Sequence, residues 1–196
     1  MRKILYCIRH GTALHNKLYW TMGRKAYTHY HDTPLLEKGW SEAEILRKEW
    51  QKIDDIDLVV VSPLMRTLST AETIFKDRNI PIIIYDGIKE YPQSGEWCNL
   101  RSSKSILMER FPSFDFSNLK TEHDTTWQRI RLTKGEELIL LNTRICQFLK
   151  WIETRDEEKI AVVSHSSFLG QMMYGEIGDE KNELKHCYPY QFTLTI

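Results

Sequence analysis

Arginine and histidine side chains stand directly after two apolar, β-prone runs of the sequence. Residues 4–8 form one run and are followed by Arg9 and His10, and residues 159–163 (KIAVV) are followed shortly by His165. An arginine presents a planar fork of donors that suits phosphate or carboxylate oxygens. A neutral imidazole can act as a nucleophile near pH 7. These residue types in this pattern indicate phosphoryl-transfer chemistry.

The two histidines can divide the work of such a reaction. One attacks the phosphorus atom, which requires one ring nitrogen to stay unprotonated while a backbone carbonyl or similar acceptor holds the other. The second donates to the phosphate oxygens as they gain charge. We expect Arg9 to grip the phosphate that His10 attacks, and Gly11 to let the backbone approach closely. A lone histidine after a strand is more often structural, so this interpretation depends on the joint pattern.

A second arginine and an acid complete the expected chemistry. Residues 57–61 (DLVVV) form another buried run, and Arg66 follows it by about one helical turn. Two arginines in one site favour a ligand with two negative charges. A carboxylic acid must then protonate the leaving alcohol. We favour Glu90 for that role, and three other carboxylates remain alternatives: Asp86, Glu96 and Glu136.

The order of expected elements predicts how these residues meet. Strands are expected at residues 3–8, 57–61, 80–85 and 159–163, with an edge strand at 190–196. Helices are expected at residues 40–52, 64–76, 103–110, 136–155 and 166–174, with 11–22 a loop or a helix. Strands that alternate with helices predict an α/β fold, a three-layer αβα sandwich with a largely parallel central sheet, as one domain over residues 1–196. Ligands in open α/β sheets bind outside the carboxyl ends of the strands, where the polar residues converge.

Composition limits the possible partners and compartment. The 196 residues include 27 basic and 27 acidic side chains, so no overall field attracts nucleic acid or an acidic membrane surface. The first apolar stretch is too short for a signal peptide and none is long enough to span a membrane, which predicts a cytoplasmic protein. The four cysteines are scattered and are expected to be reduced, with Cys7 in the core. The C-terminal edge strand is free to pair across a homodimer.

Competing motifs are weaker. DIDLV at residues 55–59 matches the DxDxV form of aspartyl-phosphate phosphatases, but it precedes its strand, whereas that nucleophile must follow one. No cysteine has an arginine six positions later, as cysteine phosphatases require. HYHD at residues 29–32 contains good zinc ligands, yet it leads into a turn without further ligands, so a loop is favoured. No GxGxxG or GxxxxGK[ST] motif occurs. Dinucleotide binding and P-loop nucleotide binding are therefore unsupported.

Several motifs in order resemble a known family. RHGTALHN (9–16), DTPLLEKGWSEA (32–43), VVSPLMRTLSTAETI (60–74), IKE (88–90) and VVSHSSFL (162–169) are similar to the motifs of the histidine phosphatase superfamily, also called the phosphoglycerate mutase-like fold. The resemblance implies that His10 becomes phosphorylated, and that the phosphate pocket consists of Arg9, Arg66 and His165. It further implies Asn16 as an extra phosphate contact and Glu90 as the proton donor, with no metal or organic cofactor required.

Other residues are expected to decide specificity. Residues 17–31 and 91–99, together with Arg101, are predicted to cap the pocket, since loops over a rigid scaffold carry specificity. Lys17 and Arg101 are candidate substrate contacts, with plain surface charge as the alternative. A mix of tyrosine, tryptophan, lysine, arginine and histidine in these stretches suits a polar, ring-bearing phosphate ester, among others.

A narrower likeness is to eukaryotic phosphoglycerate mutase-like phosphatases, in GEWCNLR (95–101), FPSFDFSNL (111–119) and residues 148–169. Mutases usually carry a tryptophan where this chain has His15, and a longer insertion than residues 91–102. We therefore expect a metal-independent phosphomonoesterase that hydrolyses a small phosphorylated metabolite through a phosphohistidine. The alternatives are a cofactor-dependent phosphoglycerate mutase and a non-catalytic module that binds phosphorylated ligands or phosphoproteins.

Overall fold

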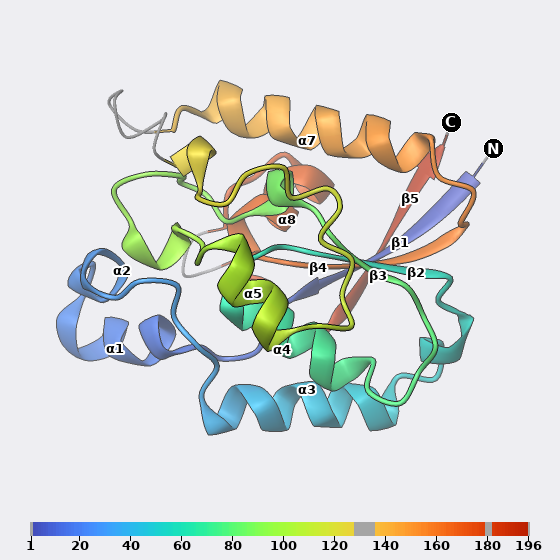
Figure 1. Ribbon diagram of the computed structural model, residues 1–196, viewed down its shortest axis with the longest axis horizontal. Coiled ribbons are helices and arrows are strands. Elements are labelled where there is room, and N and C mark those ends of the chain that lie inside the picture. The colour runs from blue at the N-terminus through green and yellow to red at the C-terminus, as the bar shows by residue number, and fades with distance from the viewer. Residues whose placement is uncertain (1, 128–135, 179–181, 196) are drawn as a thin grey trace.

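The computed structural model contains a five-stranded, mostly parallel sheet (Figure 1). It describes residues 2–127, 136–178 and 182–195. The strands, in the spatial order β3-β2-β4-β1-β5, are β1 (Arg2–Arg9), β2 (Leu58–Val61), β3 (Ile82–Ile84), β4 (Lys159–Ser164) and β5 (Pro189–Thr195). Only the pairing of β5 with β1 is antiparallel among these strands.

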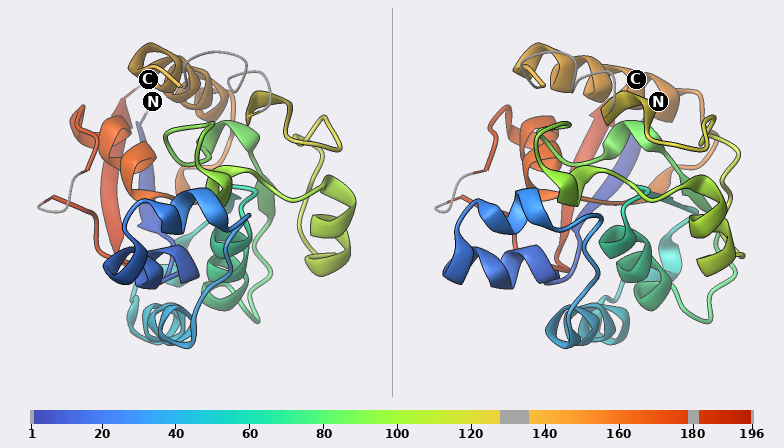
Figure 2. Two further views of the ribbon diagram at one scale, coloured as in Figure 1. Left: turned by 90° about the vertical axis from the view of Figure 1, so that its left-hand side faces the viewer. Right: turned by 60° about the vertical axis from the view of Figure 1, so that its left-hand side comes forward.

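Helices cover both faces of the sheet, which gives the three layers that the sequence predicts (Figures 1 and 2). Helices α3 (Glu37–Glu49) and α4 (Met65–Ile74) lie on one face, and α7 (Leu138–Glu153) and α8 (Ser166–Tyr174) lie on the other. Helix α5 (Lys104–Arg110) extends the layer of α3 and α4. The fold is therefore an α/β sandwich around a largely parallel sheet.

The apolar strands explain why both faces are covered. Successive side chains of a strand point to opposite faces, so Val59 and Val61 pack toward α3 and α4 while Val60 packs toward α7 and α8. All three valines are fully buried. Burying one such side chain stabilises the fold by about 1.5–3 kcal/mol. Helices on only one face of the sheet would leave the side chains on the other face exposed and lose that contribution.

The register of the parallel strands brings their carboxyl ends to one edge. Arg9 pairs with Ser164, and the amide of His10 donates to the carbonyl of Ser164 at 3.0 Å. The amide of Ser62, just after β2, donates to the carbonyl of Val163 at 3.1 Å. The residues after β1, β2 and β4 therefore meet at the same edge of the sheet, as the sequence predicts.

Most expected elements are present within a few residues, and one helix is displaced. Residues 40–52 were expected to be helical after Gly39, but α3 runs from Glu37 to Glu49, so Gly39 lies inside it. A glycine is needed inside this helix because two backbones approach closely there. A Cβ on Gly39 would collide with the Thr12 carbonyl, and one on Gly11 would lie 2.5 Å from the Gly39 carbonyl oxygen. The glycine pair lets α3 dock directly against the loop after β1.

The segment after β1 forms two helices that cover the carboxyl end of the sheet (Figure 2, left). They are α1 (Leu14–Met22) and α2 (Lys25–His29), and the second was not predicted. Helix α2 packs against the short 3-10 helix η3 (Trp97–Asn99). Two further 3-10 turns are η1 (Ile53–Asp55) and η2 (Asp86–Ile88). Helices α1 and α2 stand over the edge at which the polar residues meet.

Smaller expectations are also settled by the structure. The cysteines are free thiols, and Cys7 is fully buried in the core. The expected edge strand is β5, which ends at Thr195, and residue 196 lies outside the described residues. In the stretches that the structure describes, no helix is both long enough and apolar enough to cross a membrane.

Candidate active site

His10 is held as a neutral imidazole with one nitrogen free for reaction. Its Nδ1 lies 2.7 Å from the carbonyl oxygen of Gly11, which can only accept, so Nδ1 carries the proton and Nε2 has the lone pair. Arg66 Nε donates to that Nε2 at 3.3 Å. Burial lowers the pKa of His10 well below its usual value, and the neighbouring Arg66 adds to this. The sequence argument required this tautomer.

Two buried guanidinium groups flank His10, one from β1 and one from α4. Arg66 donates through Nη1 to the Cys98 carbonyl at 2.6 Å and through Nη2 to Asn99 Oδ1 at 2.9 Å. Arg9 donates through Nη1 to the Leu184 carbonyl at 2.7 Å. Because protein acceptors fix both forks, the two positive charges are pre-positioned rather than mobile.

His165 places a second imidazole beside the first, with ring centroids 5.2 Å apart. Its Nε2 is 2.8 Å from Ser62 Oγ, and its Nδ1 is buried without a hydrogen-bond partner among the described residues. The same holds for Nε of Arg9. A Ser62 hydroxyl that donates to Nε2 leaves the proton on Nδ1 of His165. Buried N–H groups without partners fit an anion that binds between these side chains.

We call Arg9, His10, Arg66 and His165 the phosphate floor. Its four side chains are at most 4% exposed, and they come from the ends of β1 and β4 and from the first turn of α4. The sequence predicted all four, and the structure brings them together.

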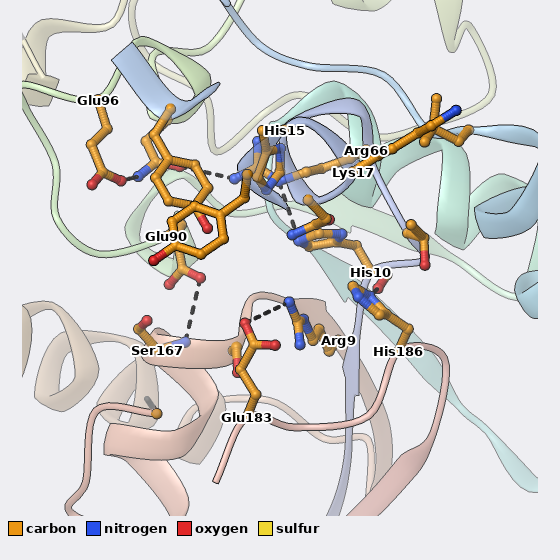
Figure 3. Close-up of a pocket in the computed structure, with 18 of the residues that line it drawn as sticks. Arg9, His10, His15, Lys17, Arg66, Glu90, Glu96, Ser167, Glu183 and His186 are labelled. Atoms are coloured by element: carbon orange, nitrogen blue, oxygen red, sulfur yellow. Dashed lines mark hydrogen bonds and ion pairs between the residues drawn. The ribbon is translucent and has the colours of Figure 1, made fainter. Parts of the chain in front are cut away.

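Glu90 lies at the N-terminus of α8, next to the floor (Figure 3). Its carboxylate accepts from the backbone amides of Tyr91 at 2.8 Å, Phe168 at 3.1 Å and Ser167 at 3.3 Å. Burial raises the pKa of Glu90 above its usual value and outweighs these bonds. A raised pKa favours a protonated carboxyl group that can donate to a leaving oxygen.

The other three candidate acids, Glu136, Asp86 and Glu96, differ in the partners that their carboxylates bind. Glu136 is bound to Arg144 at 2.8 Å and accepts from the Gln93 amide at 2.7 Å. Asp86 pairs with Lys89 and Arg101. Glu96 does line the same cavity as Glu90, and burial raises its pKa as well. Glu90 and Glu96 therefore remain the two candidates for the acid.

Asn16 and Lys17 lie where the sequence argument places them, whereas Arg101 does not. Both of the former line the cavity above the floor, and Asn16 Oδ1 accepts from the Ala13 amide, which leaves its NH₂ group as the donor. The Arg101 guanidinium donates to the carbonyls of Ser102, Thr121, Glu122 and His123. It is 3% exposed and does not line the cavity, so its prediction as a substrate contact is corrected to a structural role.

Three residues of the site were not predicted as parts of it: His15, Glu183 and His186. His186 Nδ1 donates to the His10 carbonyl at 2.6 Å, and Glu183 pairs with Arg9 Nη2 at 2.9 Å. Both precede β5 in a segment with no periodic pattern, so the sequence offered no signal for them. His15 was noted only as a departure from a mutase motif, although its ring lies 5.9 Å from that of His10.

Three residues of the floor, Arg9, His10 and Arg66, line one cavity of about 1090 Å³ together with both acids and α1 (Figure 3), and His165 is fully buried beside His10. Helices α1 and α2 and the turn between them contribute Lys17, Tyr19, Trp20, Arg24 and Tyr27 to its wall. Residues 91–99, part of the stretch predicted to cap the pocket, contribute Tyr91, Pro92, Glu96 and Asn99 to the lining. The cavity is much larger than a phosphate group, so it has room for the organic part of an ester.

Known proteins resemble this chain along most of its length. The model of the histidine phosphatase superfamily (branch 1) matches residues 5–194. The Arabidopsis thaliana phosphoglycerate mutase-like protein 1 is 32% identical, covering 85% of this chain and 69% of the relative. The adenosylcobalamin/alpha-ribazole phosphatase of Escherichia coli K12 is 26% identical, covering 93% and 83%. The solved structure of Bacillus stearothermophilus YhfR superposes with a TM-score of 0.61 at 21% identity, covering 99% of this chain and 91% of that one.

Proposed function

The chain belongs to the histidine phosphatase superfamily, and on that premise we propose that it is a metal-independent phosphomonoesterase that hydrolyses a small phosphorylated metabolite through a phosphohistidine. The observation that carries this proposal is the unprotonated Nε2 of His10, which faces Arg66 Nε at 3.3 Å within a buried cluster of donors. The E. coli relative named as a phosphatase supports hydrolysis. The free cysteines suit a reducing compartment such as the cytoplasm.

In the first step, His10 Nε2 attacks phosphorus while the bond from phosphorus to the leaving oxygen breaks. Arg9 and Arg66, with Nδ1–H of His165, stabilise the charge on the remaining phosphate oxygens. The protonated carboxyl group of Glu90 gives its proton to the leaving oxygen, so an alcohol departs. Arg9 Nε and His165 Nδ1 are both buried nitrogens without a hydrogen-bond partner among the described residues, and a bound phosphate would give them one.

In the second step, water attacks the phosphohistidine. The Glu90 carboxylate takes the proton of that water, the bond between phosphorus and Nε2 breaks, and inorganic phosphate leaves. His10 returns to its neutral form with Nδ1–H still donating to Gly11. The hydrogen bond to Gly11 holds the same tautomer through both steps, so no proton has to move on the ring between turnovers.

Transfer of the phosphoryl group to another alcohol is the competing outcome, because the Arabidopsis relatives are named phosphoglycerate mutase-like. A mutase must retain its intermediate and exclude water. The wide cavity, with Trp20 84% exposed in its wall, favours access of water to phosphorylated His10. A mutase would instead require a bisphosphate primer and would isomerise 3-phosphoglycerate faster than it releases phosphate from it.

The test is phosphate release from an aryl phosphate in the presence of EDTA, comparing wild type with His10→Ala. We expect wild-type activity to survive EDTA and the variant to lose at least about a thousandfold, because the nucleophile is gone. Labelled substrate should leave an acid-labile, base-stable phosphoryl group on wild type only. Circular dichroism and thermal melts check that the variant is folded. Activity in His10→Ala close to wild type would overturn the phosphohistidine assignment.

A further inference from the structure

A series of aromatic rings leads from the nucleophile to the mouth of the cavity. The His10 and His15 ring centroids are 5.9 Å apart, His15 and Tyr27 are 5.5 Å apart, and Tyr27 and Tyr19 are 5.3 Å apart. Trp20 follows at 6.3 Å from Tyr19. All five side chains line the cavity, so the series forms a continuous wall of it. We call His15, Tyr27, Tyr19 and Trp20 the ring wall.

Packing holds the inner part of this wall in place. His15 is 5% exposed, and its Nδ1 is hydrogen-bonded to the Thr33 hydroxyl. The rings of Tyr27 and Tyr19 stack with an interplanar angle of 26°. Because α1 carries His15, Tyr19 and Trp20 while α2 carries Tyr27, the wall is built across two helices. A preorganised wall loses little entropy when a ligand packs against it.

The inner part of the ring wall, formed by His15 and Tyr27, is uncharged although it lies next to a site for a dianion. Burial lowers the pKa of His15 well below its usual value and raises that of Tyr27, so both rings are neutral near pH 7. They neither repel the phosphate nor hold it. Their faces are suited to another flat ring, because aromatic pairs prefer offset-stacked or edge-to-face contacts.

The remaining charges in the cavity do not favour a second anionic group on the substrate. Outside the phosphate floor and Glu90, the cationic lining residues are Lys17, Arg24 and Lys38, and the acidic ones are Glu37, Glu96 and Glu183. The two sets balance in number, and Arg24 is already paired with Glu96 at 3.4 Å. Aromatic surface is therefore the feature that distinguishes this part of the cavity.

We propose that the leaving group of the substrate carries a flat aromatic or heteroaromatic ring, which packs against Tyr27 and Tyr19. This inference rests on the proposed function, since it assumes an ester whose phosphate occupies the floor. The leaving oxygen points away from His10 and meets Glu90, and both of these residues line the same cavity as the ring wall. The organic part of the ester therefore lies within the cavity that this wall lines.

Three esters of primary alcohols of similar acidity test the inference: benzyl, cyclohexylmethyl and ethyl phosphate. Wild type should show a kcat/KM for benzyl phosphate about tenfold above that for cyclohexylmethyl phosphate, and ethyl phosphate should be poorest. In Tyr27→Leu the benzyl to cyclohexylmethyl ratio should fall toward one. This ratio is measured within one preparation, so partial misfolding does not alter it. Tyr174→Leu, at an exposed tyrosine outside the cavity, is the control and should keep the wild-type ratio.

Trp20→Ala is a second variant that does not depend on core packing, because this side chain is 84% exposed. It should lower kcat/KM for the longer 4-biphenylmethyl phosphate several-fold more than for benzyl phosphate. Equal rates on the benzyl and cyclohexylmethyl esters, or a clear preference for 3-phosphoglycerate, would overturn the inference and leave the phosphatase proposal standing. Absence of phosphate release from every ester would overturn both.

Discussion

The floor and the wall of the cavity are built in opposite ways. The four side chains of the phosphate floor are almost fully buried, and a sheet of parallel strands and the helix after β2 position them. The wall comes from α1, α2, residues 91–99 and the segment before β5, and it includes the largely exposed Trp20 and the half-exposed Glu183. A rigid floor suits chemistry that every substrate shares, whereas a more exposed wall suits the part of a substrate that differs.

The largest effect expected from this comparison is at the floor, in Arg66→Ala. This change removes the donor to His10 Nε2 and the buried charge beside it, so kcat/KM should fall by about a thousandfold on any ester. Steady-state kinetics on benzyl and ethyl phosphate measure it. Because the floor serves all substrates, the loss should be equal on both, and a loss confined to one ester would contradict the division between floor and wall.

Arg101→Ala is the matched control for that change, since it also removes a buried arginine. Its guanidinium is taken up by carbonyls of residues 102 and 121–123 and by Asp86. The variant should lower the free energy of unfolding by a few kcal/mol, about the cost of orphaned buried acceptors. Its kcat/KM per folded molecule should stay within a few-fold of wild type, which denaturant titration and kinetics together would establish.

The same comparison explains how far the sequence could predict the structure. The floor was predictable because a parallel α/β sheet places all its strand ends at one edge, whatever the connecting loops do. Arg9 is the last residue of β1, and His10 and His165 directly follow β1 and β4, so naming the strands located the residues. Arg66 needed only one further step, because Pro63 ends β2 and α4 begins at Met65.

The wall was predictable only as a region. Helix α2 has five residues, too few for a periodic pattern, and it is stabilised by packing on η3 rather than by its own sequence. Glu183 and His186 reach the site only because β5 pairs with β1 and brings the preceding segment to the end of that strand. The prediction of Arg101 as a substrate contact was wrong. The sequence does not show that backbone carbonyls surround its guanidinium group and keep it away from the cavity.

A somewhat smaller effect separates the two candidate acids. Glu90→Gln should lower kcat/KM, which covers only the steps up to phosphorylation of His10, by about a hundredfold on ethyl phosphate but only a few-fold on 4-nitrophenyl phosphate, whose leaving group departs without a proton. Glu96→Gln, at the other acid of the cavity, should not show this dependence on the leaving group. The comparison of the two esters in each variant identifies the proton donor. If Glu96→Gln alone showed the dependence, the role would pass to Glu96.

The pH dependence of activity should follow the same acid. Burial raises the pKa of Glu90, and the protonated form is the donor, so activity on ethyl phosphate should fall as the pH rises through that raised pKa. With 4-nitrophenyl phosphate this decrease should be much weaker, because no proton is needed. Profiles of kcat/KM against pH for the two esters check it, and parallel profiles would argue against Glu90 as the acid.

His186 links the wall to the floor, and its effect should appear in stability. Burial, followed by the nearby Arg9, lowers the pKa of His186 to about 4 in the folded protein, against about 6.5 in the unfolded chain. As the pH falls below 6.5 the unfolded chain takes up a proton that the folded protein does not, so stability is full above pH 6.5 and is lost toward pH 4. The slope is up to about 1.4 kcal/mol per pH unit.

His186→Gln removes that titration while keeping a side chain that can donate a hydrogen bond. Urea denaturation between pH 4.5 and 6.5 should therefore show a free energy of unfolding that depends less steeply on pH than in wild type, by up to one proton. The three other buried histidines of the site, His10, His15 and His165, keep their contributions, so part of the slope should remain. An unchanged slope would mean that His186 is protonated alike in both states.

The smallest effect concerns Glu183, a carboxylate of the wall that pairs with an arginine of the floor. Glu183 pairs with Arg9 Nη2 at 2.9 Å, yet its side chain is 49% exposed, so water and salt weaken the pair. A phosphate dianion on the floor meets this negative charge, and we expect the charge to speed release of the product. Glu183→Gln keeps the shape and removes the charge, so inorganic phosphate should inhibit it at about threefold to fivefold lower concentration than wild type at low salt. At 0.5 M salt the two should converge, because an exposed charge is screened there, whereas the loss in Arg66→Ala should persist. A Glu183→Gln inhibition constant equal to that of wild type at low salt would show that the wall contributes no charge to the phosphate site and acts on the organic part of the substrate alone.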